Sequence, residues 1–476
     1  MRRAAPRPAP ASESGFSLIE LVISMLIAVE ILIAAAIAFD VHNKIANVQV
    51  QITDLQQSMR VAQYDINRTL RTAGRGGMPF DLRPNADFDE TAAIPAVSGV
   101  AIEVRNNVTG DARYVARGDN TSPQAIAGSD ILTVRGCIAG TAYQIDPSTF
   151  EWDADDNGVG DSDAVLSIPD TSVAGLAQPL GPLVQEIQVY AAAPRGRMAL
   201  VSPTALQVYA VADIVSMVVN GLAANPTSVD LTLDLDNASP INPVNLNAVG
   251  YDPTAPELSR MYPPEMTVAL VCFLEEYRYY VREVAGDALT PLRPRLTRAR
   301  FEPGTELPYL GDAQSFSLDL ADGIFDVQVA LGLDTDFTVN GFDATVPGSY
   351  NDDSDWIDVD DVIFEADPYD EAQNGDADDW LYNDTGDAVD AIQYTTHSFD
   401  DNAGNPVQVY FVRVSVAGRT ARLDRSYQAP ELDTRADGDW IEDHNLDANP
   451  GLNYNSGDAL KHRRRVLQAI VDMRNV

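Results

Sequence analysis

Oxygen-bearing side chains recur at alternate positions between residues 153 and 163, a pattern that can bind a hard cation. Gly158 stands at the sixth position, where a calcium loop makes its sharp turn. The usual glutamate at the twelfth position is absent because Ala164 stands there, so Asp163 would have to replace it. The candidate calcium ligands are Asp153, Asp155, Asn157, Val159, Asp161 and Asp163. Both a calcium site and a solvated acidic turn fit this pattern.

The other polar residues do not form a recognisable catalytic set. The histidines, His42, His397, His444 and His462, are isolated, and the spacing of the cysteines fits no zinc site. Neither a nucleophile elbow nor a phosphate-binding loop is evident. We therefore expect a structural or binding protein rather than an enzyme, with calcium as the one candidate cofactor.

Cys137 and Cys272 both lie in apolar segments that resemble strands. A secreted setting would allow a disulfide between them. Two separate buried thiols that pack as small hydrophobic groups are the alternative.

Length and charge limit the classes of protein that the chain can belong to. With 476 residues, 45% of them hydrophobic, it can form one large domain or two ordinary ones. The net charge of -39 argues against nucleic acid as a partner, because a phosphate backbone would be repelled. Such acidity suits a solvated exterior, bound divalent cations or a saline habitat.

The first 39 residues predict a membrane anchor. Residues 1–15 are polar and contain Arg2, Arg3 and Arg7, whereas residues 16–39 are almost wholly apolar. A basic head before an apolar run of this length predicts one transmembrane helix with its N-terminus in the cytoplasm. An ordinary signal peptide would be cleaved after its apolar run. Here the candidate cleavage site precedes that run.

The segment GFSLIEL, from Gly15 to Leu21, resembles the class III signal of type IV prepilins. The resemblance implies that residues 1–15 form a leader peptide, which prepilin peptidase removes after Gly15 before methylating the new N-terminus at Phe16. Glu20 would then be the fifth residue of the mature chain. In pilin assemblies this carboxylate is thought to receive the amine of a neighbouring subunit.

Glu20 and Glu30 place carboxylates inside the apolar run. A charged group costs about 2.5–3.5 kcal/mol at the centre of a bilayer, and less near its surface, so each needs a partner. Glu20 shares a helix face with Phe16, four residues earlier, and a free amine there would be its nearest cation. Glu30 lies about 80° away around the helix and needs a different solution. Either its side chain contacts a companion helix, or the membrane tolerates this acid without a specific partner because its side chain reaches toward the membrane surface.

Helical periodicity continues from residue 40 to residue 74. Apolar residues there alternate spacings of three and four, and Gly74 provides a stop signal. The expected stripe consists of Ile45, Val48, Ile52, Leu55, Met59, Ala62, Ile66, Thr69 or Leu70, and Ala73. We expect this amphipathic half to pack on the chain's own sheet, with a coiled-coil partner as the alternative.

The remaining residues, 75–476, predict a β-rich head, which makes the fold class α+β. Alternating, β-branched segments predict strands at 100–104, 130–138, 229–235, 267–274, 277–284 and 407–416. Residues 139–265 and 337–405 resemble acidic insertions that can form a second lobe. Within the latter, the aspartate-rich segments 352–361 and 376–379 are expected to be solvated.

Several head segments are similar to PilW-type minor pilins, which are related to the J-type pseudopilins of type II secretion. These segments are residues 68–77, 128–135, 276–281, 321–336 and 470–475. In the family, the segment equivalent to 321–336 runs from a helix into a strand and then an aspartate-rich loop. The resemblance implies the type IV pilin fold, in which a long N-terminal helix packs on an antiparallel sheet.

The same resemblance implies a minor pilin that initiates or caps a type IV pilus. Its partners would be other major and minor pilins, prepilin peptidase and the inner-membrane assembly platform. It would remain in the inner membrane, with its head in the periplasm, until it joins a pilus or pseudopilus. A J-type pseudopilin and a calcium-dependent adhesin delivered by pilin machinery are the alternative functions.

Overall fold

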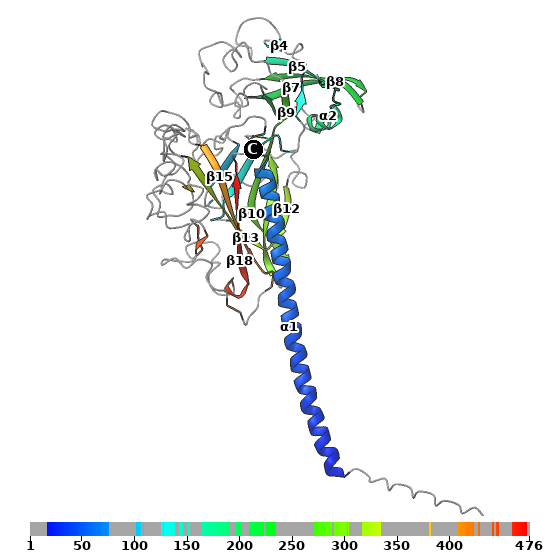
Figure 1. Cartoon of the computed structure of the whole chain (residues 1–476), viewed down its shortest axis with the longest axis vertical. Helices are drawn as coiled ribbons and strands as arrows, with labels where there is room; N and C mark the ends of the chain where they lie inside the picture. Colours follow the sequence, from blue (N-terminus) through cyan, green and yellow to red (C-terminus); the bar gives the residue numbers. More distant parts are fainter. Residues whose placement is uncertain are drawn as a thin grey trace, which may run out of the picture. The chain divides into compact units, whose positions relative to one another are not determined.

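The computed structural model combines one long helix with antiparallel sheets (Figure 1), which makes the fold α+β. It describes residues 17–75, 101–105, 108, 125–126, 128–138, 142–145, 151–152, 163–172, 174–189, 197–201, 209–222, 225–234, 270–287, 290–301, 303, 317–334, 380–381, 408–422, 427–428, 440–441, 444–446 and 459–473. Two compact units divide the chain between Asp54 and Leu55.

The long helix, α1, runs from Leu18 to Leu70 and contains 53 residues. At ~1.5 Å per residue it is about 80 Å long. It begins at Leu18, two residues later than the sequence predicted, because Ser17 caps its N-terminus. Its regular hydrogen bonding ends at Leu70, and turns over residues 71–75 lead to Gly74, whose φ of 71° closes the helix.

Burial along α1 begins later than its apolar periodicity predicted. Ile45 is 48% exposed, and Val48 and Ile52 are only half-buried. The stripe that the head buries consists of Leu55, Met59, Ala62, Ile66, Thr69, Leu70 and Ala73. The expectation that the whole stretch from residue 40 packs on the sheet was therefore wrong for residues 40–54.

Two antiparallel sheets supply the other side of this core. The first has the order β1-β2-β10-β11-β12, with β1 at Ile102–Arg105, β2 at Ile131–Gly136, β10 at Glu275–Asp287, β11 at Thr290–Phe301 and β12 at Ser317–Asp322. The second has the order β14-β13-β15-β18, with β14 at Trp380–Leu381, β13 at Ile324–Asp334, β15 at Gln408–Arg419 and β18 at Arg464–Asp472. Alternate residues of both sheets and the α1 stripe form one hydrophobic core.

The chain passes directly from one sheet to the other at Gly323, between β12 and β13. Its φ is 81°, and a Cβ there would lie 2.6 Å from the carbonyl oxygen of Arg419, so only glycine fits. The helix expected at the start of residues 321–336 was wrong, because β12 lies there, whereas the strand expected after it is present as β13. Phe325, Val327 and Val329 alternate with period two, which favours a strand.

Residues 128–130 join the sheets at a second place, beside β13. The backbone N–H of Asp130 donates to the carbonyl of Val327 at 2.9 Å, and the N–H of Val329 donates to Asp130 Oδ2 at 2.7 Å. Gln328 Nε2 donates to the carbonyl of Gly128 at 2.8 Å. These bonds satisfy polar groups of β13 that would otherwise be left at a sheet edge.

A third sheet forms a second lobe of the head, whose hydrophobic core includes Tyr280 and Phe301 of the first sheet. Its order is β3-β9-β6-β7-β8-β5-β4, with β3 at Tyr143–Gln144, β4 at Glu151–Trp152, β5 at Asp163–Pro169, β6 at Arg197–Val201, β7 at Tyr209–Leu222, β8 at Asn225–Asp234 and β9 at Leu270–Phe273. Helix α2, Leu180–Val189, packs against β8 through Leu183, Val184 and Ile187. The expected insertion at 139–265 supplies all of these elements except β9. Of the expected insertion at 337–405, only β14 lies within the described residues.

Three small elements complete the described structure. A two-stranded sheet pairs β16, Trp440–Ile441, with β17, His444–Asn445. The 3-10 helix η6, Ala459–Lys461, precedes β18.

The contact between α1 and β15 generates a prediction at Gly418. A Cβ on Gly418 would lie 2.7 Å from Leu55 Cδ1 and 3.1 Å from Met59 Cγ. We expect Gly418→Val to lower the free energy of unfolding by about 2 kcal/mol, because the helix must move away from β15. Chemical denaturation of the purified protein measures this loss.

Gly181 on α2 offers a matched control, since a Cβ there meets nothing within 4 Å. We expect Gly181→Ala to be neutral or to stabilise the protein by roughly 0.5–1 kcal/mol. Equal destabilisation by the two substitutions would contradict close packing at Gly418.

Candidate assembly site

The N-terminus of α1 is closed by a reciprocal cap between Ser17 and Glu20. The backbone N–H of Ser17 donates to Glu20 Oε2 at 3.1 Å, and the N–H of Ile19 approaches Ser17 Oγ at 3.4 Å. This is the capping-box arrangement, in which a serine and a glutamate three residues later satisfy free N–H groups of the first turn. Glu20 therefore holds its carboxylate at the positive end of the helix dipole. The candidate processing residues Gly15 and Phe16 lie outside the described residues.

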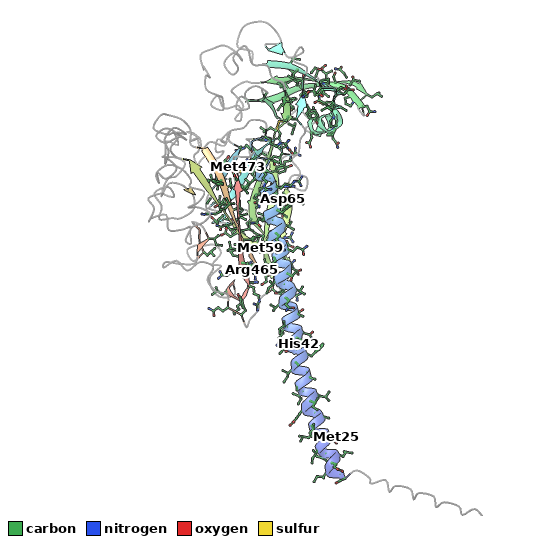
Figure 2. The ribbon with its side chains drawn as sticks, viewed as in Figure 1. Met25, His42, Met59, Asp65, Arg465 and Met473 are labelled. Carbon is green, nitrogen blue, oxygen red and sulfur yellow. A yellow bond between two sulfur atoms is a disulfide. The ribbon has the colours of Figure 1, made fainter. Side chains whose placement is uncertain are left out.

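The first part of α1 is long and apolar enough to cross a membrane, and its most apolar window contains no buried residue. Leu18 is 83% exposed and Phe39 is 69% exposed. Side chains on every face of this segment are exposed, as a lipid-facing helix requires. Figure 2 shows these side chains along the helix, with Met25 among them.

Glu30 lies in the middle of this apolar segment and is exposed. Within the described residues no hydrogen bond or ion pair is recorded for its carboxylate. Glu20, in contrast, has the Ser17 N–H as its partner. The two acids thus differ, because only Glu20 sits where the helix provides free donors.

Polar residues resume directly after Phe39. Asp40 and Lys44 form an ion pair at 2.8 Å across one helical turn. The hydrogen bond from Lys44 to Asp40, together with the charge of that carboxylate, raises the pKa of Lys44. This pair marks the end of the segment that a bilayer can accommodate.

A polar cluster fixes α1 on the first sheet. The Tyr279 hydroxyl donates to Asp65 Oδ2 at 2.8 Å and shares a 2.6 Å hydrogen bond with Thr69 Oγ1. Arg298 Nη1 reaches both oxygens of Asp65 at 3.0 Å. Burial, and then the charge of Asp65, raise the pKa of Tyr279, so this tyrosine stays a neutral donor. Because Asp65 and Thr69 are four residues apart, one sheet residue fixes both the rotation and the height of the helix.

The end of α1 is attached to β2 by backbone hydrogen bonds. The N–H of Gly74 donates to the carbonyl of Arg135 at 3.0 Å, and the N–H of Cys137 donates to the carbonyl of Arg75 at 2.8 Å. The helix therefore leads into the sheet without a free polar backbone group at these positions.

Cys137 and Cys272 form a disulfide, with their Cα atoms 6.0 Å apart. Of the two alternatives that the sequence left open, the structure has the bridge. Cys137 follows β2, where the chain leaves the first sheet, and Cys272 lies in β9, just before the chain returns to that sheet in β10. The bridge thus closes the neck of the lobe, and 135 positions separate its two ends.

The face of the first sheet that points away from α1 holds a buried network of charges. Arg135 donates to Glu103 and Glu276 at 2.7 Å each, and Arg278 contacts Glu276 at 2.7 Å. Arg105 also reaches Glu103 at 3.0 Å. Burial alone would raise the pKa of Glu103, but Arg135 and Arg105 outweigh it and lower that pKa from 4.5 to about 2. The network joins three strands, β1, β2 and β10.

The candidate calcium ligands are mostly outside the described residues. Asp153, Asp155, Asn157, Val159 and Asp161 fall there, and Asp163 begins β5, where it pairs with Asp234 of β8. Among the residues that the structure describes, no group of three or more His, Cys, Asp or Glu side chains is arranged to hold a metal ion. The calcium hypothesis therefore stays a prediction.

Comparison of the chain with family models, curated proteins and solved structures finds no match. The architecture, a long apolar N-terminal helix followed by a β-rich region, is compatible with a pilin-like protein. The functional argument therefore rests on the residues and contacts of this chain.

Two features of the site were missed by sequence reasoning. A serine followed three residues later by a glutamate is the sequence signal of a capping box, and Ser17 and Glu20 show it. The helix was expected to begin at Phe16 because the apolar run begins there. The docking cluster has no such local signal, because Asp65 and Tyr279 are 214 positions apart. Only the pairing of β10 with β2 and β11 brings Tyr279 under the helix.

The low pKa of Glu103 generates a prediction about acid stability. Its folded value of about 2 lies below its ordinary value of 4.5. Its contribution is therefore complete above pH 4.5 and is lost as the pH falls toward 2. We expect this group alone to remove up to about 3 kcal/mol of the free energy of unfolding over that range. Denaturant titrations at several acidic pH values measure the slope.

Glu103→Gln tests the assignment to this residue. We expect the variant to be less stable than the original protein at neutral pH, because Arg135 and Arg105 lose a charged partner. Its stability should also change less between pH 4.5 and pH 2. An unchanged acid slope in this variant would mean that other carboxylates cause the loss.

Proposed function

We propose that this chain is a minor pilin, a structural subunit that helps to initiate or cap a type IV pilus. The observation that carries the proposal is the division of α1 at Leu55. Before this residue the helix exposes an apolar surface that a membrane or other apolar helices can cover. From this residue onward the helix is the central element of a β-rich head. A subunit that is first anchored in a bilayer and later built into a fibre needs both halves.

The capping box supports a specific role for Glu20 in this proposal. Cleavage after Gly15 would create a positively charged amine on Phe16, next to the residue whose N–H already contacts Glu20. In an apolar environment an amine and a carboxylate are each costly unless they are paired. Glu20 would therefore pair with its own new amine in the membrane and exchange it for a neighbouring subunit's amine during assembly. An assembly ATPase elsewhere in the machinery would supply the energy for extraction.

The size of the third-sheet lobe favours a place in the fibre where a subunit has room for additional volume. The chain enters and leaves its seven-stranded sheet through a neck that the disulfide closes, and the lobe also packs on the first sheet through Tyr280 and Phe301. At the tip of a fibre such a lobe meets no subunit above it. This consideration favours a capping subunit over a subunit that repeats along the fibre.

A J-type pseudopilin of type II secretion is the second candidate. It shares the N-terminal signal and the helix-plus-sheet architecture, so the two candidates differ in their assembly partners. Co-purification with a secretion platform rather than a pilus platform would favour this alternative.

Processing of the N-terminus gives the first test of the proposal. We expect mass spectrometry of the membrane-extracted protein to find a mature chain that begins with methylated Phe16. An intact Met1, or cleavage after Phe39, would contradict a prepilin. Deletion of the gene should also abolish or sharply reduce surface pili, and unchanged piliation would exclude the pilus role.

Substitutions at Glu20 separate its capping role from its charge. Glu20→Gln keeps an acceptor for the Ser17 N–H but removes the charge, whereas Glu20→Ala removes both. We expect both variants to insert into the membrane and neither to enter pili, measured by fractionation and by immunoblotting of sheared fibres. Asp54→Asn, an exposed change of the same charge on α1, should assemble normally. Normal assembly of Glu20→Gln would mean that capping, and not charge pairing, is the function of Glu20.

A calcium-dependent adhesin is the remaining alternative, and calcium titration tests it. If residues 153–163 bind calcium, millimolar calcium should raise the midpoint of thermal unfolding, because a ligand that binds only the folded state stabilises it. The change should disappear in Asp153→Ala and persist in Asp352→Ala. No shift in the original protein would remove the calcium site.

A further inference from the structure

The outer face of the head-bound part of α1 carries a row of arginines. Residues 55–75 contain four cationic side chains and one acidic one, in a chain whose net charge is -39. All four arginines are exposed, and the tyrosine and the valine that lie among them are 70% and 46% exposed. We call this set the arginine stripe; its members are Arg60, Val61, Tyr64, Arg68, Arg71 and Arg75. The arginine stripe is a cationic surface with a valine and an aromatic ring among its charges.

Helix geometry places the arginine stripe on one face of α1. At ~100° per residue, every member from Arg60 to Arg71 falls within an arc of about 100°. The residues that this part of α1 buries in the head lie on the opposite side. Arg60 and Arg71 are about 16 Å apart along the axis at ~1.5 Å per residue. The arginine stripe is therefore a narrow band that runs parallel to the helix axis.

The head does not neutralise the charges of the arginine stripe. Among the residues that the structure describes, none of its four guanidinium groups has an ion pair or a hydrogen bond. Asp65, the one acid in this segment, already accepts from Arg298 Nη1 at 3.0 Å and from the Tyr279 hydroxyl at 2.8 Å. Four positive charges are therefore available to a ligand.

The helix dipole explains only part of this arrangement. Cations near a helix C-terminus are favourable, and Arg68 and Arg71 lie in or next to the last turn of α1. The dipole acts within that turn, but Arg60 lies ten positions before Leu70. It also gives no reason to expose Tyr64 among the charges. A binding surface explains all of these features, because arginine and tyrosine are enriched at protein interfaces.

We infer that the arginine stripe binds an acidic helix of another protein, which lies along α1 with its carboxylates facing the guanidinium groups. Carboxylates three or four residues apart on one helix face recur at intervals of about 4.5–6 Å, as the members of the arginine stripe do. Each guanidinium can hold a carboxylate through two hydrogen bonds. Val61 and Tyr64 would contact the side chains between those carboxylates. A strand fits less well, because it docks through main-chain bonds to a free strand edge.

The inference concerns the head alone. The second compact unit, Leu55–Val476, contains the whole arginine stripe. The inference therefore needs neither a particular placement of the apolar half of α1 nor assembly into a pilus.

Two other occupants have matching charge but fit less well. Nucleic acid offers phosphates, yet a long polyanion would extend over the acidic remainder of the chain and be repelled. A second copy carries the same net charge of -39, and a two-fold contact would place one arginine stripe against the other. An acidic helix needs only the local surface, within a screening length of about 8–10 Å.

Binding of synthetic helices to the full chain in detergent micelles tests this inference. The probe is a fluorescent peptide of about 20 residues, long enough to be helical, with glutamates three and four residues apart on one face and alanines elsewhere. We expect fluorescence anisotropy, corrected with empty micelles, to give a dissociation constant in the micromolar range at low salt. A peptide of the same composition, with its glutamates spread evenly around the helix, should bind at least about fivefold more weakly.

Charge reversal assigns the binding to the arginine stripe. Arg68→Glu with Arg71→Glu should weaken binding at least about tenfold, because two attractions become repulsions, and should leave the midpoint of thermal unfolding unchanged. Arg422→Glu with Arg465→Glu is the matched control, with the same change of charge at exposed positions elsewhere on the head. That control should bind as the original protein does. Arg60→Gln with Arg68→Gln only removes charge, and should weaken binding by about threefold in a protein that folds normally.

Four results would overturn the inference. Equal binding of the two peptides, or undiminished binding by the reversed pair, would mean that the protein attracts any acidic polymer. Tighter binding of single-stranded DNA of equal charge would mean that the arginine stripe fits phosphates. A dimer of the original chain that becomes a monomer in the reversed pair, measured by light scattering, would mean that a second copy covers the arginine stripe. No binding up to about 1 mM peptide would mean that it holds no acidic helix.

Discussion

The structure depends on the docking of the second part of α1 against both main sheets of the head. Leu55, Met59, Ala62 and Ile66 are almost fully buried, and a fully buried apolar side chain contributes about 1.5–3 kcal/mol. Among the described residues outside the two sheets, Ile441 of β16 and Leu446 also contribute to this core. The helix is therefore a part of the head's core, so a force on the anchor acts directly on that core.

Specificity in this docking comes from a few polar and small residues. An apolar stripe alone specifies the rotation and height of a helix only loosely, because hydrophobic attraction has no direction. Asp65 and Thr69 fix both, since displacement by one turn would leave the buried Tyr279 hydroxyl and the half-buried Arg298 without their partners. Gly418 adds a steric requirement, because a Cβ there would lie 2.7 Å from Leu55 Cδ1 and 3.1 Å from Met59 Cγ. On the opposite face of the first sheet, the buried charges around Arg135 fix strand register in the same way.

The sequence predicts this fold well where a local pattern determines the structure. Periodicity indicated α1 and the strands β1, β2, β8, β9, β10 and β15, with boundaries in error by a few residues. Strand β11 was not predicted, because its prolines and its arginines 293, 295, 298 and 300 hide the alternation. The site shows the same limit: Glu20 is prominent in sequence, whereas the partner of Asp65 is set by sheet pairing far along the chain. The start of burial at Leu55 also depends on where the head ends, which the helix sequence does not contain.

The disulfide shows how the head accommodates a large lobe without disturbing the docking of α1. The chain leaves the first sheet after β2 and re-enters it at β10, and these two strands are neighbours in that sheet. An insertion between adjacent strands changes no pairing within the sheet, provided that its two ends stay together. The bond between Cys137 and Cys272 holds those ends together. Closing a loop of this length lowers the entropy of the unfolded chain, which stabilises the folded state by roughly 4–5 kcal/mol. The backbone N–H of Cys137 also donates to the carbonyl of Arg75, just after the end of α1, so the neck of the lobe and the end of the helix are joined at one place. A ligand that pulls on the lobe would therefore transmit its load to α1 through covalent and hydrogen-bonded contacts at the same place.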